Sequence, residues 1–311
     1  MLWQFLAMPD ETLDQADIVR LNLAVASEIP GLKSLDIEKY VSTVDAWTAK
    51  FRAMLPGMEQ KFHATPHKWK NDIRFFRVGM LQGFLGHIIG VRYNDEQKYA
   101  KAVYYKNPSD LFLNGVIDTL QGTCGNMATL HVAIARRMGW PVSIACAKTH
   151  LLSRYDDGEV VHNIEATSTQ PGTFASDPDA EYIKRFNLPQ KAIECGSGLR
   201  RLTAREMAGV FLALRARHYQ DIRDLEHADS SYALSRVLFP SYRDACARSI
   251  VPFLWRAGQL FNPGEIGHPD SIFDGLAPTI SPAVYHTHMA REGVSTHPMS
   301  LMKTSERTIG V

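Results

Sequence analysis

The chain has 311 residues, of which 45% are hydrophobic and 22% are charged, and these are the proportions of an ordinary globular protein. They exclude a disordered chain, and the length is sufficient for two domains or for one large core with appendages. Lys and Arg together number 34 and Asp and Glu 33, so the net charge of +1 gives no electrostatic reason to expect nucleic acid or an acidic membrane as a partner.

The sequence indicates neither a membrane protein nor an oxidising compartment. No apolar run reaches the roughly 20 residues that span a bilayer, and the first residues lack the basic start of a secretory signal. The cysteines are widely spaced and form no Cys-x-x-Cys pair, unlike those of a disulfide framework or a zinc site. We therefore expect a cytoplasmic protein with reduced thiols and without a metal or cofactor. The cysteines are Cys124, Cys146, Cys195 and Cys246.

The N-terminal region, residues 1–106, is predicted to be helical. Pro56 and Gly57 are expected to end one of its helices, because proline removes a hydrogen bond from a helix interior. Another helix contains three glycines, so either close packing or a break near Gly90 is expected. Apolar residues recur at helical spacing in residues 17–26, 37–55 and 70–89.

The segment that follows is predicted to form the entrance to a site. Residues 93–99 and 104–110 are polar and aromatic, with a strong turn at Asn107-Pro108. Ser109 or Asp110 can cap a helix over residues 111–120. That helix would deliver the chain to the stretch Gln121-Gly-Thr-Cys124-Gly-Asn-Met-Ala.

A helix and an antiparallel sheet are predicted next. Apolar residues follow one helical face over residues 124–138, and Gly139 and Pro141 are typical of helix termination. Strands are expected over residues 142–147, 150–155 and 159–165, with a hairpin turn between the last two.

The turn fixes a testable pairing between His150 and Glu165. If Asp157 and Gly158 form a two-residue loop, His150 lies directly opposite Glu165, with Cβ atoms about 4.5–5.5 Å apart. A carboxylate there can orient the imidazole and stabilise its charged form. His162 would lie on the other face of the sheet and outside this group.

Cys124 opens its helix, and this position favours a reactive thiol. The partial positive charge and free amides of a helix N-terminus stabilise a thiolate and can bind an oxyanion. Gly122 and Gly125 would leave the backbone uncovered for a substrate carbonyl, and Gln121 could add a side-chain donor or serve a structural role. Cys124, His150 and Glu165 thus have the residue types of a nucleophile, its base and an orienting acid.

Ordinary structural roles are open for the same residues. A free cysteine is often a small buried hydrophobe, which is the role expected for Cys146 and Cys246. A cross-strand His-Glu pair can be a surface pair of little energy. His131 is expected to pack, and the scattered C-terminal histidines lack acidic or cysteine companions for a metal site.

The C-terminal part is predicted to return to helices. Residues 166–200 are expected to form a loop with one short helix at 179–186. Around Pro240, a helix that ends and restarts at once resembles a joint between tetratricopeptide repeats. Residues 264–311 are expected to be irregular. The predicted helices are residues 203–219, 227–238 and 242–260.

The motif Gly122-Thr-Cys124-Gly-Asn-Met-Ala128-Thr-Leu130, followed by His150 and Glu165, resembles the core of the transglutaminase-like superfamily, a branch of the papain-like cysteine fold. The resemblance covers residues 111–167. The outer arrangement is similar to a bacterial branch with a helical N-terminal region and a tetratricopeptide-like C-terminal region. The resemblance of the core implies a Cys-bearing helix packed on an antiparallel sheet that carries first His and then Asp. This chain has the longer Glu165 in place of that Asp.

We therefore expect an α+β fold with a papain- or transglutaminase-like core between helical regions. The expected function is cysteine-dependent acyl transfer from a peptide, protein or small amide or thioester, with Cys124, His150 and Glu165 catalytic and Gln121, Gly122 and Gly125 at the oxyanion and substrate. The alternative is a catalytically inactive module that binds a protein, for instance through its C-terminal helices. The expected regions are residues 1–106, the core at 107–200, 201–263 and the tail at 264–311.

Overall fold

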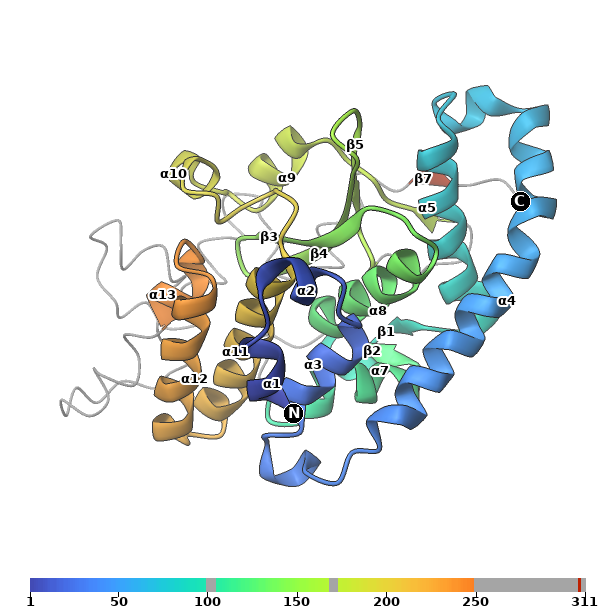
Figure 1. Ribbon diagram of the computed structural model, residues 1–311. Helices are drawn as coiled ribbons and strands as arrows, with labels where there is room; N and C mark the ends of the chain where they lie inside the picture. Colours follow the sequence, from blue (N-terminus) through green and yellow to red (C-terminus); the bar gives the residue numbers. More distant parts are fainter. Residues whose placement is uncertain (99–104, 168–172, 249–306, 309–311) are drawn as a thin grey trace.

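The computed structural model describes residues 1–98, 105–167, 173–248 and 307–308 (Figure 1). Its helices are α1 (Leu2–Leu6), α2 (Asp10–Asp14), α3 (Ile18–Ala26), α4 (Ile37–Ala64), α5 (Ile73–Gly83), α6 (Asp95–Lys98), α7 (Leu113–Thr119), α8 (Cys124–Arg137), α9 (Asp179–Arg185), α10 (Gln190–Glu194), α11 (Ala204–Asp221), α12 (Leu225–Leu238) and α13 (Arg243–Arg248). Its strands are β1 (Arg92–Tyr93), β2 (Gln121–Gly122), β3 (Val142–Ala147), β4 (His150–Asp156), β5 (Val161–Ile164), β6 (Thr173–Phe174) and β7 (Arg307–Thr308).

A small sheet lies between layers of helices, which confirms the predicted α+β class. β3, β4 and β5 form an antiparallel sheet in that order. Figure 1 shows α8 on one side of this sheet and α9 and α10 on the other. Ser153 on β4 donates a hydrogen bond to the carbonyl of Ala128 in α8 at 3.2 Å. Leu152, its neighbour on the opposite face, packs with Tyr182 of α9.

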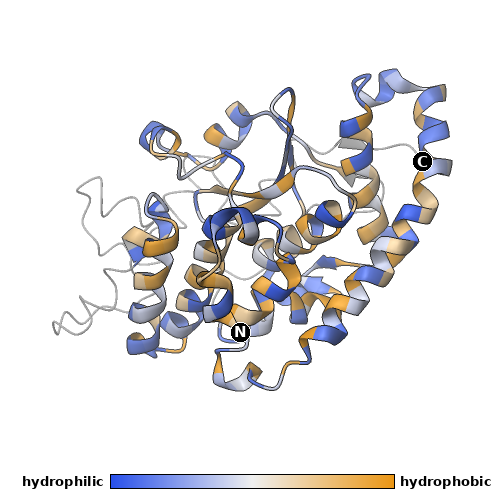
Figure 2. Ribbon diagram, viewed as in Figure 1, coloured by the Kyte–Doolittle hydropathy of each residue, from blue (hydrophilic) through white to orange (hydrophobic). Residues whose placement is uncertain are grey.

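The helix α4 continues through Pro56, so the predicted end at this proline is wrong. Its buried positions, among them Phe51, Leu55 and Phe62, continue past the proline, and hydrophilic and hydrophobic residues alternate along it in Figure 2. The ring of Phe62 lies 5.4 Å from that of Phe76 in α5. Packing beyond the proline stabilises the last turns and compensates for the lost hydrogen bond.

Caps fix where the neighbouring helices begin. Asp17 accepts the amides of Val19 and Arg20 at the start of α3, at 2.7 and 3.1 Å. The start of α7 differs from the prediction, because neither Ser109 nor Asp110 caps it. The amide of Leu113 instead donates to the side chain of Asn22 in α3, at 3.0 Å.

The region of the third predicted helix is divided in two. α5 gives way to a π-helical turn, Phe84–Ile89, and the chain then passes through Gly90 in the left-handed conformation, with φ of 90°. The predicted break near Gly90 is confirmed. The strand β1 follows and pairs in parallel with β2, so that Tyr93 lies beside Gly122.

The hairpin of β4 and β5 has a wider loop than predicted. Asp156 pairs with Val161, which leaves residues 157–160 in the loop. Asp157 explains the difference, because its carboxylate accepts the amides of Glu159 and Val160 at 3.0 and 2.9 Å. These hydrogen bonds stabilise a turn over residues 157–160, which is longer than a two-residue loop. If this pairing is continued by one residue beyond β5, Glu165 lies opposite Leu152 and not opposite His150.

The C-terminal helices pack on the rest of the chain. α11 and α12 form an antiparallel helical pair (Figure 1), and α11 starts against the N-terminal helices, where the amide of Ala204 donates to Asp14 at 2.7 Å. One hydrophobic cluster runs from Leu2 to Ala245. The predicted region boundaries and the tetratricopeptide likeness stay predictions.

The short helix predicted at 179–186 is confirmed as α9, while α10 was not predicted.

Other predictions concern the C-terminal end of the chain. The predicted extension of the last helix to 260 and most of the tail at 264–311 lie outside the described residues; the tail residues within them form β7. Among the described helices, none is long and apolar enough to cross a membrane.

Candidate active site

Cys124 is the first residue of α8, as predicted, and the start of this helix is firmly held. The amide of Thr123 donates to the side chain of Asn126 at 2.8 Å. Asn126 in turn donates to the carbonyls of Ser109 and Phe112, both at 3.2 Å. The first turn of α8 is therefore tied to the segment before α7. Cys124 is 8% exposed and lies at a helix N-terminus, whose partial positive charge favours an anion.

His150 and Glu165 are in contact, although they do not face each other directly. His150 Nε2 lies 2.7 Å from Glu165 Oε2, and the two residues are 2% and 1% exposed. In the observed register they are diagonal neighbours on one face of the sheet, about 7–8 Å apart at the backbone. The predicted contact is present, but the predicted direct opposition is wrong. The long arm of a glutamate can span this diagonal.

The carboxylate of Glu165 is held from its other side by Thr167. The hydroxyl of Thr167 donates to Glu165 Oε1 at 2.8 Å, and its amide approaches the same oxygen at 3.4 Å. The amide of Glu165 leaves the hairpin and donates to the carbonyl of Ala175 at 3.0 Å. Both carboxylate oxygens thus have partners, which fixes the orientation of the acid.

The surroundings of His150 favour its charged form. Burial lowers the pKa of the imidazole, but the charge of Glu165 and hydrogen bonding to Cys124 and Glu165 outweigh burial and raise the pKa to about 10. The second ring nitrogen, Nδ1, is buried and makes no hydrogen bond of ordinary geometry to the described part of the chain. Since Glu165 occupies Nε2, Nδ1 is the ring nitrogen left for Cys124.

Two tyrosines from the predicted entrance segment lie near the thiol. Tyr93 is only 4% exposed; burial and the charges of Cys124, Glu165 and Asp110 raise its pKa. Burial and the charge of Cys124 likewise raise the pKa of Tyr105. These two tyrosines form a wall of the site. They are among the aromatic residues of the segment predicted to form its entrance.

The helix α11 holds Tyr105 in this position. The backbone amide of Tyr105 donates to Asp221 at 2.9 Å, and its carbonyl lies 2.9 Å from His218 Nδ1. Arg217, which also bonds Asp221 at 2.8 Å, lies over the tyrosine ring. A helix outside the sheet and α8 therefore completes one wall of the site.

The predicted oxyanion and substrate residues lie at the start of α8, in closely packed surroundings. The side-chain oxygen of Gln121 accepts the amide of Asp95 at 3.3 Å, which favours its structural role. A Cβ at Gly122 would lie 2.4 Å from Asn126 Oδ1, and one at Gly125 would lie 3.2 Å from Leu214. Both glycines allow close packing; the expectation that they uncover the backbone for a substrate stays a prediction.

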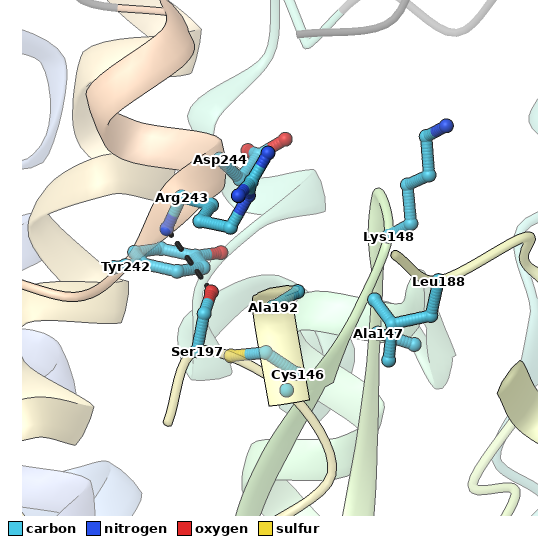
Figure 3. Close-up of a pocket in the computed structure, with 10 residues that line it drawn as sticks. Cys146, Ala147, Lys148, Leu188, Ala192, Ser197, Tyr242, Arg243 and Asp244 are labelled. Atoms are coloured by element: carbon cyan, nitrogen blue, oxygen red, sulfur yellow. Dashed lines mark hydrogen bonds between the residues drawn. The ribbon is translucent and has the colours of Figure 1, made fainter. Parts of the chain in front are cut away.

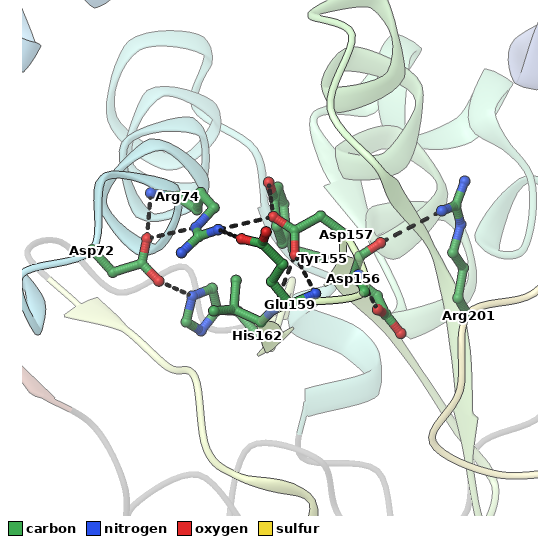
Figure 4. Close-up of polar contacts among 10 residues, drawn as sticks. Asp72, Arg74, Tyr155, Asp156, Asp157, Glu159, His162 and Arg201 are labelled. Carbon is green, nitrogen blue, oxygen red and sulfur yellow. Dashed lines mark hydrogen bonds and ion pairs between the residues drawn. The ribbon is translucent and has the colours of Figure 1, made fainter.

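His162 lies outside this group, as predicted. Its Nε2 is 2.9 Å from Asp72 Oδ2, within a polar network that joins α5 to the hairpin loop through Arg74 (Figure 4). Burial lowers the pKa of His162. Arg74 bridges Asp157 and Glu159, each at 3.1 Å. The network therefore anchors the far end of the hairpin.

The other titratable candidates have structural positions. His131 is fully buried in α8, and burial lowers its pKa to about 4, so it packs as a neutral ring. Cys146 is 3% exposed and burial raises the pKa of its thiol. It lines a separate small pocket with Ser197 and Tyr242 (Figure 3). Among the described residues, no group of His, Cys, Asp or Glu could hold a metal ion.

The residues that sequence reasoning missed are Thr167, which holds the acid, and Phe186, whose ring stacks on His150 at 4.8 Å. No local pattern identifies either, because each contact depends on how distant segments pack.

The model of the transglutaminase-like superfamily matches residues 38–192. The matched range contains Cys124, His150 and Glu165, and it runs from α4 to α10. No curated protein and no solved structure matches the chain.

Proposed function

The chain belongs to the transglutaminase-like superfamily, whose members are generally cysteine-based enzymes, and from this premise we propose that it transfers acyl groups through a Cys124-His150-Glu165 triad. The observation that carries the proposal is the buried contact of His150 with Glu165 at 2.7 Å, which leaves the second imidazole nitrogen for Cys124. The substrate would be an amide or thioester of a peptide, a protein or a small molecule.

The triad residues have distinct tasks in the proposed reaction. The Cys124 thiolate attacks the carbonyl carbon of the substrate. The oxyanion that forms accepts a hydrogen bond from the backbone amide of Cys124. His150 gives its proton to the leaving amine or thiol, and a thioester with Cys124 remains. His150 then takes a proton from water or from an amine that attacks the thioester. The thiolate and the imidazolium are thereby regenerated.

Glu165 acts through His150. Its negative charge and the hydrogen bond at Nε2 stabilise the imidazolium that accompanies the thiolate. Its contact also fixes which ring nitrogen carries the proton toward Cys124. The proposal does not depend on Gln121, whose side-chain oxygen accepts a hydrogen bond from the amide of Asp95.

The low exposure of the triad favours the second candidate, an inactive binding module. Cys124, His150 and Glu165 are 8%, 2% and 1% exposed, so a bulky carbonyl would need the site to open. In such a module Cys124 would behave as a buried structural thiol.

An activated ester distinguishes the two candidates without knowledge of the natural substrate. Incubation with p-nitrophenyl acetate should place an acetyl group on Cys124, detectable by peptide mass spectrometry and removable by hydroxylamine. Cys124→Ala should lose this adduct and the ester hydrolysis with it. Cys195→Ala is the matched control, because Cys195 is the exposed thiol, and it should retain both. Hydrolysis that persists in Cys124→Ala, or acetylation of Cys195 alone, would refute the acyl-transfer proposal.

A further inference from the structure

An aromatic cover lies over the His150–Glu165 pair on the side away from α8. The ring of Phe186 stacks on the imidazole of His150 with centroids 4.8 Å apart and planes 8° from parallel. Behind it, Tyr182 stacks on Phe186 at 6.0 Å and 12°. Phe186 is only partly buried, so it forms the outer layer between the imidazole and solvent.

The start of α9 is clamped to the same face of the sheet. Arg154, 6% exposed, donates to both carboxylate oxygens of Asp179, at 2.7 and 3.3 Å. Asn163 on β5 donates to Asp179 at 2.6 Å. Bidentate pairs of this kind fix orientation as well as distance.

The clamp determines where Phe186 lies. Arg154 and His150 share a face of β4, and the strand between them is about 13 Å long at roughly 3.3 Å per residue. From Asp179 to Phe186 the helix rises about 10 Å at roughly 1.5 Å per residue. Because α9 is fixed to Arg154 at its start, the ring of Phe186 at its end lies over His150. Tyr182 fills the space between, fully buried beside Leu152.

We propose that Phe186 is a positioning residue for the acyl-transfer reaction, whose flat ring holds the plane of the His150 imidazole and keeps water from the His150–Glu165 contact. This inference rests on the proposed function. An aromatic face also favours a cation above it, so the stack stabilises the imidazolium that pairs with the Cys124 thiolate. A branched aliphatic side chain could exclude water but could not hold a ring plane.

Charged and titratable groups reach the pair from each surrounding element. Cys124 of α8 and Glu165 act on His150 directly. Tyr93 of β1 and Tyr182 of α9 lie near Glu165, and burial raises the pKa of both. These tyrosines stay neutral over the range of the experiment below, so the change it measures belongs to Cys124 and His150.

The experiment is the alkylation of Cys124 by iodoacetamide, followed by peptide mass spectrometry, at about pH 6 and about pH 10, where an ordinary thiol is mostly protonated and mostly ionised respectively. In the native protein the rates at the two values should be similar. Phe186→Ala and Phe186→Leu should slow alkylation at the lower pH by about tenfold relative to the native protein and leave the rate at the higher pH within about twofold. Phe186→Trp should retain the native ratio.

Leu188→Ala is the matched control, because Leu188 belongs to the same apolar cluster under α9 and α10; it should keep the native ratio. A native ratio in Phe186→Leu would overturn the inference, since an apolar cover would then be sufficient, and so would a native ratio in Phe186→Ala. If Phe186→Ala does not fold, the comparison of Leu with Trp decides. An ordinary, protonated thiol in the native protein would instead overturn the proposed function itself.

Discussion

At the scale of single residues, the charge of Glu165 determines the protonation of His150. The charge of this carboxylate is the largest influence that raises the pKa of the imidazole; together with hydrogen bonding to Cys124 and Glu165 it outweighs burial and brings the pKa to about 10. The charged form is therefore present below that pH and is lost above it. A thiolate at Cys124 depends on this cation.

The change Glu165→Gln removes the negative charge and keeps the shape of the side chain. The pKa of His150 should fall, because burial then acts without the opposing carboxylate. We expect the alkaline limb of ester hydrolysis by Cys124 to move to lower pH by at least about one unit, measured as the pH dependence of kcat/KM. Asp156→Asn is the control, a carboxylate at the far end of β4. An unchanged alkaline limb in Glu165→Gln would remove Glu165 from this role.

A substitution at Gly122 tests the tight packing beneath Cys124, the proposed nucleophile. A methyl group at this position would lie 2.4 Å from Asn126 Oδ1 and 2.6 Å from Met127 Cγ, and overpacking of this kind costs about 1–3 kcal/mol. We expect Gly122→Ala to lower the melting temperature. Gly57→Ala, in α4 with no atom within 4 Å of its Cβ, should raise it slightly, because alanine favours a helix by about 1 kcal/mol. Equal melting temperatures for the two variants would contradict this packing.

At the scale of elements, the hairpin register explains why an acid longer than aspartate occupies position 165. Ser153 pairs with Ile164, so Glu165 reaches His150 along a diagonal. An aspartate at this position would be one methylene shorter.

The substitution Glu165→Asp should therefore impair the site, although it preserves the charge. We expect kcat for ester hydrolysis to fall by at least about tenfold, or about 1.4 kcal/mol in the barrier, with little change in the melting temperature. Full activity in Glu165→Asp would show that the backbone adjusts and that the diagonal contact imposes no requirement on length.

The sequence predicted elements well where their signals are local. The bounds of β3 and the start of α8 follow from periodicity and from the Gly139 and Pro141 stop. The loop after β4 was not predictable in the same way. Its width depends on the Asp157 carboxylate accepting Glu159 and Val160, a choice that residue types alone do not reveal.

Long-range contacts decided the remaining differences. α4 passes Pro56 because Phe62 packs on Phe76, far along the chain. α7 begins where Asn22, from α3, accepts the amide of Leu113. Neither partner is near in sequence, so a local cap or breaker was the wrong guide.

At the scale of the whole molecule, α11 completes the site and the core together. Its start is tied to α2, with Arg205 donating to Asp10 and the amide of Ala204 to Asp14. Its middle packs Leu214 against Gly125, and its end holds Tyr105. The site depends on helices that lie outside the range matched by the family, residues 38–192.

A chain that ends at residue 200 should therefore fail to fold as an independent core. Removing α11 would expose the surfaces that bury Val210, Phe211 and Leu212, each 0% exposed. We expect no cooperative thermal transition by circular dichroism, whereas a chain ending at residue 248 should unfold cooperatively. A cooperative transition near the native temperature in the shorter chain would show that the C-terminal helices form a separate domain.

The sequence was sufficient to predict the proposed reacting residues of the site, but not the residues that surround them. Cys124, His150 and Glu165 could be named because helix start, strand order and residue type all favour one kind of chemistry. Thr167 and Phe186 could not, since their contacts arise only when β5, α9 and the sheet are assembled.

In the proposed reaction the His150 imidazolium holds Cys124 as a thiolate, and the pH dependence of Cys124 alkylation measures this state. The rate of iodoacetamide modification of Cys124, followed by peptide mass spectrometry, should be nearly constant from about pH 6 to about pH 9 in the native protein and should fall strongly at the low end in His150→Ala. A native rate that rises about tenfold per pH unit up to about pH 8.5, as for a free thiol, would contradict the account.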